Sequence, residues 1–181
     1  AQILRVIREC GPISRVDIAS SMKITRAAVT IITNEMIEEG VLYEVGEAPV
    51  SIDHLQKGRR KILIDINENY RYALGASISD ERITVGFANI NGKIIDKVMT
   101  EALDGMSSDD IIEYIVSSCR SIMQNNNIEP KKFVGLGVGL SSDMCSKMKV
   151  YMKDGKFDYS SIVDALSKAL DMPVTCSNLT C

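Results

Sequence analysis

The 181-residue sequence predicts an α/β protein of two domains, in which a small helical domain with a β-ribbon precedes a partial, mixed α/β domain. Three observations predict this class. Two short segments of helical periodicity flank a brief turn, two apolar strands then flank a basic loop, and beyond residue 70 the apolar residues follow the period of strands. We place the boundary in the polar junction that follows the second apolar strand, so that residues 1–68 form the first domain and 69–181 the second.

The first domain is predicted to contain three helices. Residues 2–9 carry apolar residues on one side and end at Gly11-Pro12. A second helix runs from Ser14, its expected N-cap, to Ser21. A third follows Met22-Lys23-Ile24 and ends at Gly40. Helical spacing divides the third helix into a core side with Ala28, Val29, Ile32 and Met36, and an opposite side with Arg26, Ala27, Thr30 and Asn34.

A two-stranded ribbon is predicted after the third helix. Strands at 41–45 and 61–66 flank a loop whose tip reads Gln56-Lys57-Gly58-Arg59-Arg60-Lys61. Helix, turn, helix and a hairpin with a basic tip is the order of a winged helix-turn-helix.

This order predicts DNA binding. Small and polar residues near the N-terminus of the third helix can approach base edges in a major groove, where a guanidinium pairs with guanine acceptors. The basic tip can bind phosphates or enter a minor groove. A protein-interaction module with a solvated basic loop is the alternative. The expected DNA contacts are Ser14, Thr25, Arg26, Ala27, Thr30, Lys57, Arg59 and Arg60.

Charge limits how such binding could work. The net charge is −3, from 21 Lys and Arg against 24 Asp and Glu. The part up to Ile66 has nine of each sign, which leaves twelve basic and fifteen acidic residues for the rest. DNA affinity must therefore come from local placement of charge.

The remaining composition argues for a cytoplasmic protein without metal or cofactor. No apolar run is long enough to span a bilayer, and the start AQILRVIREC is an amphipathic helix and not a signal peptide. The five cysteines contain no CxxC pair, so they predict neither a disulfide framework nor a zinc site. His54 is the sole histidine and cannot form a metal site or a Cys/His couple alone.

The second domain is predicted to begin with a three-stranded meander at 72–78, 82–90 and 93–100, turned by Asn91-Gly92. A helix capped by Ser108 or Asp109 runs to Gln124. A buried strand at 133–140, an outlying strand at 147–152 turned by Asp154-Gly155, a helix at 160–170 and a strand from Pro173 follow. Three antiparallel strands, helix, strand, helix, strand is the order of half a ribonuclease-H-like domain.

Several segments resemble the ROK (repressor, open reading frame, kinase) family, in its group of sugar-responsive repressors. They are GPISRVDIASSMKITRAAVTIITNEMIEEGVL, GRRKILIDINENYRYALGASIS and ITVGFANINGKII. The resemblance implies a winged helix followed by an actin-like sugar-kinase domain. Because the second domain of that family is much longer than residues 71–181, the chain resembles a regulator truncated after the first lobe.

The resemblance also allows the kinase residues to be checked. Where the kinases carry a glycine-rich phosphate loop, this sequence has Ser77 to Glu81, with two acidic residues and no glycine. Where they carry the catalytic Asp of an Asn-Asp pair, it has Asn178-Leu179, and leucine cannot accept a proton. The sequence therefore predicts that the chain is not an enzyme, with a ROK-type sugar kinase as the alternative.

A sugar site is the other implication of the resemblance. The loop that helps to shape it in the family corresponds to Gly139–Cys145, and the candidate sugar-binding residues are Ser141, Ser142, Asp143 and Asn178. Plain turn chemistry is the alternative for this serine-rich loop. The repeat of Gly135, Gly137 and Gly139 is not a dinucleotide fingerprint and indicates close packing around a buried strand. The zinc motif of the family would lie beyond Cys181.

Together these inferences predict a homodimeric, sequence-specific transcriptional regulator, a repressor of carbohydrate genes that binds an operator and responds to a sugar or sugar phosphate. An interaction module without ligand is a further alternative.

Overall fold

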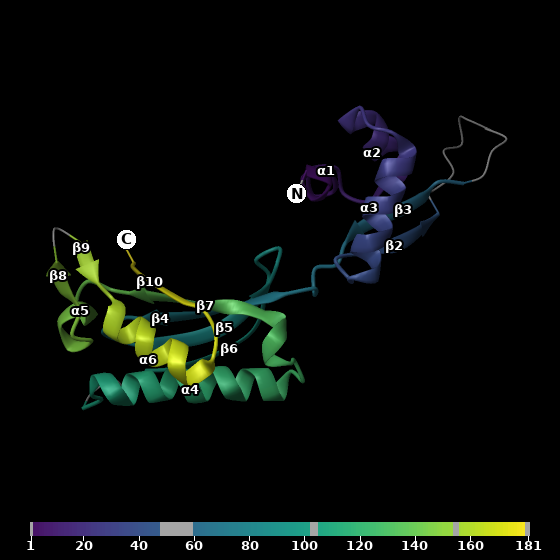
Figure 1. Cartoon of the computed structure of the whole chain (residues 1–181). Helices are drawn as coiled ribbons and strands as arrows, with labels where there is room; N and C mark the ends of the chain where they lie inside the picture. The colour runs from purple at the N-terminus through teal and green to yellow at the C-terminus, as the bar shows by residue number, and fades with distance from the viewer. Residues whose placement is uncertain (1, 48–59, 102–104, 154–155, 180–181) are drawn as a thin grey trace. The chain divides into compact units, whose positions relative to one another are not determined.

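The computed structural model describes residues 2–47, 60–101, 105–153 and 156–179 (Figure 1). The chain folds into two compact units, Ala1–Tyr70 and Arg71–Cys181. Each unit has a hydrophobic core of its own, and the two cores share no residue.

The first unit is a winged helix-turn-helix, as the sequence predicts. Its elements are α1 (Gln2–Cys10), β1 (Ile13–Ser14), α2 (Arg15–Met22), α3 (Arg26–Glu38), β2 (Leu42–Glu47) and β3 (Ile62–Ile66). The three strands form an antiparallel sheet in the order β1-β3-β2. The two-residue strand β1 was not predicted, because a strand so short has no periodicity to recognise. The core contains Ile3, Ile7, Ile18, Ala19, Val29, Leu42 and Ile64.

The end of α3 follows the predicted glycine signal. Gly40 has φ +78°, and its amide bonds to Ile37 O at 2.9 Å while the amide of Val41 bonds to Met36 O at 2.8 Å. This is the Schellman pattern, in which a residue in the left-handed region closes the last turn. The chain then enters β2 directly.

The second unit contains a five-stranded mixed sheet. Its strands are β4 (Tyr72–Ile78), β5 (Ile83–Asn89), β6 (Ile94–Thr100), β7 (Phe133–Leu140) and β10 (Val174–Asn178), in the order β10-β7-β4-β5-β6. β4, β5 and β6 form the predicted antiparallel meander, whereas β7 pairs in parallel with both β4 and β10. The carboxyl ends of β4, β7 and β10 therefore meet at one edge of the sheet.

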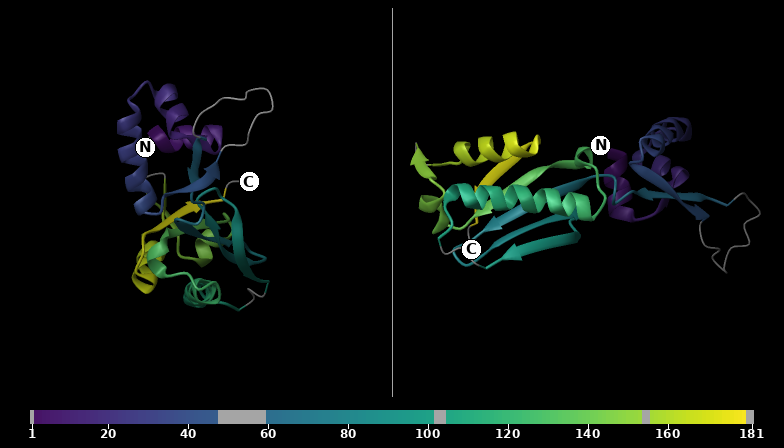
Figure 2. Two further views of the ribbon diagram at one scale, coloured as in Figure 1. Left: turned by 90° about the vertical axis from the view of Figure 1, so that its right-hand side faces the viewer. Right: turned by 90° about the horizontal axis from the view of Figure 1, so that it is seen from below.

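Helices α4 (Ser108–Asn125) and α6 (Ser160–Leu170) cover one face of this sheet (Figure 2). Alternate residues of β4 and β5 are buried on that side, as period 2 requires. Ser107 is the N-cap of α4, not Ser108 or Asp109 as predicted. Its hydroxyl accepts from the amide of Asp110 at 3.2 Å, and the Asp110 carboxylate accepts from the amide of Ser107 at 2.7 Å. The Ser107 hydroxyl also donates to the Asp110 carboxylate at 2.7 Å, and this bond, together with the one from the Ser107 amide, lowers the pKa of Asp110.

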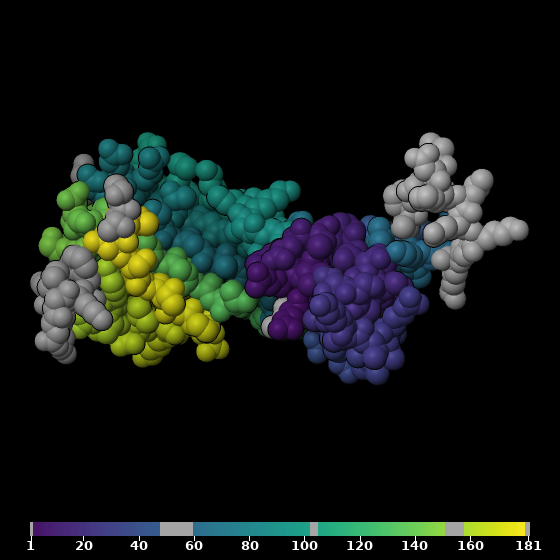
Figure 3. Space-filling view, turned by 90° about the horizontal axis from the view of Figure 1, so that it is seen from above, coloured from purple at the N-terminus to yellow at the C-terminus, as the bar shows by residue number. Residues whose placement is uncertain are grey.

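Within the described part of the second unit, α4 and α6 lie on the same side of the sheet (Figure 1), and residues of β4, β5 and β6, coloured teal, lie at the surface seen from the other side (Figure 3). Small side chains line it, and the register aligns Gly86 with Gly75 and Gly75 with Gly137 across three strands. A shallow depression of about 370 Å³ lies there, bordered by Ile94 and Lys97.

The outlying strand predicted at 147–152 is present only in its last part. It is β8 (Tyr151–Lys153), which pairs with β9 (Lys156–Asp158) in a small hairpin, and a one-turn helix, α5 (Met144–Lys147), precedes it. Met148 and Val150, which suggested that the strand begins earlier, are buried in the segment between α5 and β8. The turn residues Asp154 and Gly155 lie outside the described residues.

Candidate nucleic-acid interface

The turn between α2 and α3 is defined by two capped helix ends. At the end of α2, Lys23 adopts the left-handed region with φ 55°, and the amide of Ile24 bonds to Ala19 O at 3.1 Å. Thr25 then caps α3, its hydroxyl accepting from the amide of Ala28 at 3.2 Å. The caps leave only three residues between the helices and set the angle at which α3 leaves the turn.

Four of the predicted contact residues lie together on the exposed surface of this helix-turn-helix. Thr25 precedes α3, and Arg26, Ala27 and Thr30 lie in its first two turns, all exposed. The hydroxyl of Thr30 donates to Arg26 O at 2.8 Å, so its methyl group and its acceptor lone pairs are the parts available outward.

Ser14 does not share this surface. It is only 2% exposed, its hydroxyl caps α2 by accepting from the amide of Asp17, and it also donates to the Asp17 carboxylate at 2.6 Å. The prediction of Ser14 as the N-cap is confirmed. The prediction that Ser14 contacts DNA directly is corrected, because its hydroxyl is buried and caps the N-terminus of α2.

The core side of α3 also differs from the prediction at one position. Ile32 is 39% exposed, whereas Thr33 is fully buried beside Val29. Thr33 satisfies its hydroxyl within the helix by donating to Val29 O at 2.8 Å. Hydrophobicity predicts Ile32 and not Thr33 for the core, but a threonine whose hydroxyl bonds to its own helix can also be buried there.

Ile31 is a surface residue that the sequence reasoning missed. It is 61% exposed in the middle of α3, at the i+4 position from Ala27 and beside Thr30. An apolar side chain so placed can meet the methyl group of thymine. Its helical spacing from Ala27 was the available signal.

The two halves of α3 differ in charge. Arg26 lies in the first turn, whereas Glu35 and Glu38 lie in the last two turns and Glu39 follows as the C-cap, all exposed. Carboxylates repel phosphates, so the N-terminal half is the end that a duplex could approach.

The wing is tied to α2 at its base. The ammonium of Lys61 donates to both carboxylate oxygens of Asp17, at 2.8 and 3.2 Å. This bond from Lys61, together with that from Ser14, lowers the pKa of Asp17. Arg60 is exposed and pairs with Glu47 at 2.7 Å across the ribbon. Lys57 and Arg59 lie outside the described residues.

The candidate sugar residues gather at the carboxyl edge of the parallel strands. Ser141 follows β7, its amide bonds to Ile78 O at 2.9 Å, and the Nδ2 of Asn178 donates to Ser142 Oγ at 3.3 Å. Ser141 Oγ and Asn178 Oδ1 are buried and have no hydrogen-bond partner among the residues that the structure describes. Asp143 is exposed at the start of α5. Ser141, Ser142 and Asn178 are thus brought together by three strand ends.

The segment that corresponds to the phosphate loop of the kinases is a tight turn between β4 and β5. The amide and hydroxyl of Ser79 both bond to Arg82 O, at 3.0 and 3.2 Å, and Asp80 and Glu81 are exposed between them. Leu179 is 41% exposed just after β10. The two positions that the resemblance compares with the phosphate loop and the catalytic base of the kinases are thus an acidic turn and an exposed apolar side chain.

The three glycines of β7 differ in how closely other atoms approach them. A Cβ on Gly135 would lie 2.6 Å from Pro173 O, and one on Gly139 would lie 2.5 Å from the side chain of Leu179. At Gly137 the nearest atoms would be 4.0 Å away. Close packing therefore explains Gly135 and Gly139 but not Gly137.

Within the described ranges, no group of three or more His, Cys, Asp or Glu could hold a metal ion. Burial raises the pKa of Cys119 to about 12 and that of Cys176 to about 11, so both thiols are protonated at neutral pH. No described helix is long and apolar enough to cross a membrane.

Comparison with known proteins agrees with this architecture. Residues 2–43 match the family model described as winged helix-turn-helix DNA-binding. The putative xylose repressor of Caldicellulosiruptor sp. (strain Rt8B.4) is 26% identical over 138 residues, which are 76% of this chain and 33% of that protein. The N-acetylglucosamine repressor of Escherichia coli O157:H7 is 30% identical over 95 residues, 52% of this chain and 22% of that protein.

A solved structure shows the same fold. The crystal structure of a ROK family transcriptional regulator, a homologue of the E. coli MLC protein, is similar over 97% of this chain and 44% of its own, with a TM-score of 0.61 and 16% identity. The chain spans about one third of the length of the xylose repressor that it matches. The chain is thus similar in sequence to xylose and N-acetylglucosamine repressors, and its fold, a winged helix-turn-helix followed by a mixed α/β unit, is that of a solved ROK family transcriptional regulator.

Proposed function

We propose that the chain is a sequence-specific, DNA-binding transcriptional repressor of carbohydrate genes that acts in the cytoplasm. The observation that carries the proposal is the N-terminal half of α3, where Arg26, Ala27, Thr30 and Ile31 are exposed on a capped, rigid helix. The names of the relatives, a xylose repressor and an N-acetylglucosamine repressor, support the link to sugars.

The reading mechanism follows from these side chains. Arg26 donates to the N7 and O6 acceptors of guanine, while Ile31 and the methyl group of Thr30 contact thymine methyl groups. Thr25 and Ala27 allow the helix end to approach the bases closely. Glu35, Glu38 and Glu39 keep the other half of α3 away from the phosphates.

The wing supplies phosphate contacts through Arg60, with Lys57 and Arg59 of the same basic tip. Arg60 exchanges Glu47 for a phosphate on binding. Both partners are more than half exposed, so the ion pair that is given up is weak.

The protein acts as a homodimer on a two-fold operator. One winged helix reads only a few base pairs, and pairing two of them one helical turn apart raises both affinity and specificity.

The second unit senses a polyhydroxyl effector, a sugar or sugar phosphate, without turning it over. The buried, unpaired Ser141 Oγ and Asn178 Oδ1 are suited to pair with hydroxyl groups, and Ser142 and Asp143 adjoin them. Phosphoryl transfer is not part of the function, because Leu179 cannot act as a base and the turn at Ser79 has no phosphate cradle.

The proposal is tested by selecting bound duplexes from a random-sequence library and measuring affinity for the selected and a scrambled duplex. We expect Arg26→Ala to weaken binding to the selected duplex by about tenfold or more, the value of one bidentate base pairing, and to change scrambled binding little. Equal reductions on both duplexes, or no enriched sequence, would contradict the proposal.

Two further measurements separate the roles and the alternative. Replacing Arg59 and Arg60 together should flatten the dependence of log K on log salt, by about 0.9 for each phosphate that the wing no longer neutralises. ADP release in the presence of hexoses would instead support a sugar kinase.

A further inference from the structure

The side chain of Arg15 connects three elements of the winged helix. Arg15 is the first residue of α2, and its side chain is 19% exposed. Its Nε donates to Thr33 Oγ1 at 3.0 Å, its Nη2 to Asn34 Oδ1 at 3.1 Å, and its Nη1 to Glu44 Oε1 at 3.1 Å. Two acceptors lie on α3 and the third on β2.

The chemistry of the guanidinium makes this connection rigid. The group is planar, permanently charged, and presents its N–H donors at fixed angles. Three bonds to acceptors on two other elements therefore fix α3 and β2 relative to α2. Thr33 is fully buried and donates its own proton to Val29 O, so a lone pair is left to accept from Arg15.

We propose that Arg15 is a positioning residue, which holds the reading helix α3 and the wing strand β2 in one arrangement and does not itself contact DNA. The proposal rests on the proposed function, because it concerns how the reading surface is held. A cation at the first turn of a helix in such a domain would otherwise be assigned to a phosphate.

The bond to Asn34 has a consequence for base reading. Arg15 is a donor only, so the oxygen of the Asn34 amide must face it, and the Nδ2 donors are the part left to point elsewhere. Asn34 can then donate to a base acceptor but cannot make the two-way pair with adenine that needs both ends of the amide.

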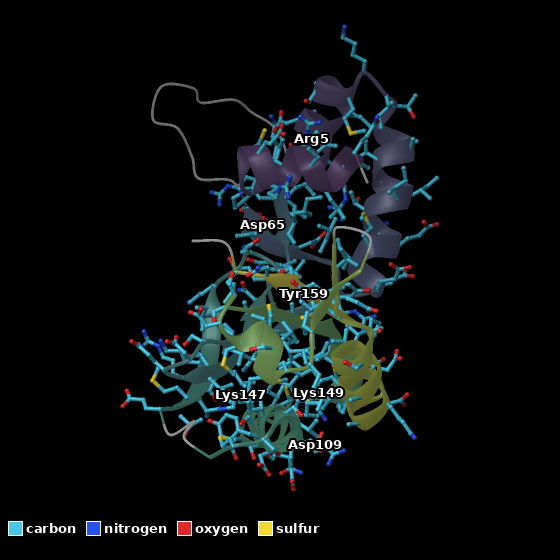
Figure 4. The ribbon with its side chains drawn as sticks, turned by 90° about the vertical axis from the view of Figure 1, so that its left-hand side faces the viewer. Arg5, Asp65, Asp109, Lys147, Lys149 and Tyr159 are labelled. Atoms are coloured by element: carbon cyan, nitrogen blue, oxygen red, sulfur yellow. The ribbon has the colours of Figure 1, made fainter. Side chains whose placement is uncertain are left out.

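The test compares Arg15→Ala, Arg15→Lys and Glu44→Gln in the full chain. Lysine keeps the charge but cannot present three nitrogens in one plane, whereas glutamine keeps an oxygen acceptor for Nη1. The matched control is Arg5→Ala, which removes a cation from the same unit (Figure 4). The Nε of Arg5 donates to Glu9 on its own helix, so this side chain does not connect different elements through that bond.

We expect both Arg15 variants to reduce the ratio of selected to scrambled binding by about tenfold, as much as the removal of one base-reading side chain, with the salt slope unchanged. Glu44→Gln and Arg5→Ala should stay near the wild-type ratio. A wild-type ratio of selected to scrambled binding in Arg15→Lys would overturn the proposal in favour of phosphate binding. So would an Arg15→Ala variant whose salt slope is reduced by about 0.9 while this ratio is unchanged.

A second measurement, made without DNA, distinguishes a failure of the Arg15 proposal from a failure of the proposed DNA-binding function. In the free chain, Arg15→Ala should change the amide residual dipolar couplings of α3 relative to those of β2, while the couplings within α1 and within α3 keep their wild-type pattern and show that the first unit is folded. Unchanged couplings between α3 and β2 would overturn the positioning role. Absence of any selected duplex for the wild type would refute DNA reading, and this measurement would still decide what Arg15 does.

Discussion

Asp17 serves two structures at once. It completes the N-terminal cap of α2 through Ser14, and it holds Lys61 at the base of the wing. The ionised form makes both sets of contacts, which is why its pKa is lowered in the folded protein. The stability that Asp17 contributes is therefore present above its unfolded pKa of about 4 and is lost as pH falls through the folded pKa.

Asp17→Asn should consequently destabilise the first unit at neutral pH by up to about 1 kcal/mol, since the pair is nearly half exposed and screened by solvent. The difference from wild type should shrink as the pH is lowered below about 4. Urea unfolding at several pH values measures it. In a Lys61→Met background, the pH-dependent part of the effect of Asp17→Asn on the free energy of unfolding should be smaller. An effect of Asp17→Asn that is equal at all pH values would contradict this account.

Lys23 carries a backbone cost that glycine would remove. Its φ of 55° lies in the left-handed region, where a Cβ is unfavourable. Lys23→Gly should stabilise the first unit by about 0.5–1 kcal/mol, whereas Lys168→Gly, inside α6, should destabilise the second by about 1 kcal/mol. Thermal unfolding of both variants tests the pair, and a loss of stability in Lys23→Gly would show that the lysine side chain makes an interaction worth more than its strain.

Strand β7 lies between two parallel neighbours, and its glycines meet different surroundings. The register pairs Gly137 with Gly75 on one side and Thr175 on the other, whereas Gly135 meets the backbone of Pro173. The amide of Leu136 bonds to the same carbonyl, Pro173 O, at 2.9 Å. The strand thus needs glycine at position 135, where another backbone approaches it, and not at position 137.

Gly135→Ala should therefore destabilise the second unit by about 2 kcal/mol or more, because a rigid carbonyl and a φ of +153° both oppose the methyl group. Gly137→Ala is the matched control on the same strand, and it should be neutral or stabilising by about 0.5 kcal/mol. Chemical denaturation followed by circular dichroism gives both values. If both substitutions changed the free energy of unfolding equally, the effect of Gly135→Ala would come from backbone entropy and not from steric crowding.

The two units are stabilised by separate hydrophobic cores. Ile18 in the first and Ile115 in the second are both fully buried, and they belong to clusters without a common residue. A cavity made in one cluster leaves the packing of the other intact.

Ile18→Ala and Ile115→Ala should each destabilise their own unit by about 2–5 kcal/mol and leave the other unit near wild type. Hydrogen exchange of amides in α3 and in α4 reports the two units separately. A loss of protection in both units from either variant would show that they unfold as one.

The element order of both units was predictable because each relies on local signals. The periodicity of α3 and α4, the Asn91-Gly92 turn and the glycine after α3 act over a few residues. Two predictions placed a boundary wrongly: Ser107 and not Ser108 caps α4, and the strand predicted from Lys147 begins at Tyr151, after a short apolar run that is not a strand. In such runs burial overrides the intrinsic preference of the segment.

The amino-acid order alone therefore established the winged helix, the meander and the exposed Arg26, Ala27 and Thr30, since helical phase is a property of neighbouring residues. Only the folded chain revealed that Ser14 is buried, that Ile31 stands exposed, and that Arg15 joins residues 18, 19 and 29 positions away. The same holds for Ser141 and Asn178, which the parallel strands bring to one edge. These contacts depend on the packing of distant elements, and no local pattern encodes the distance between them.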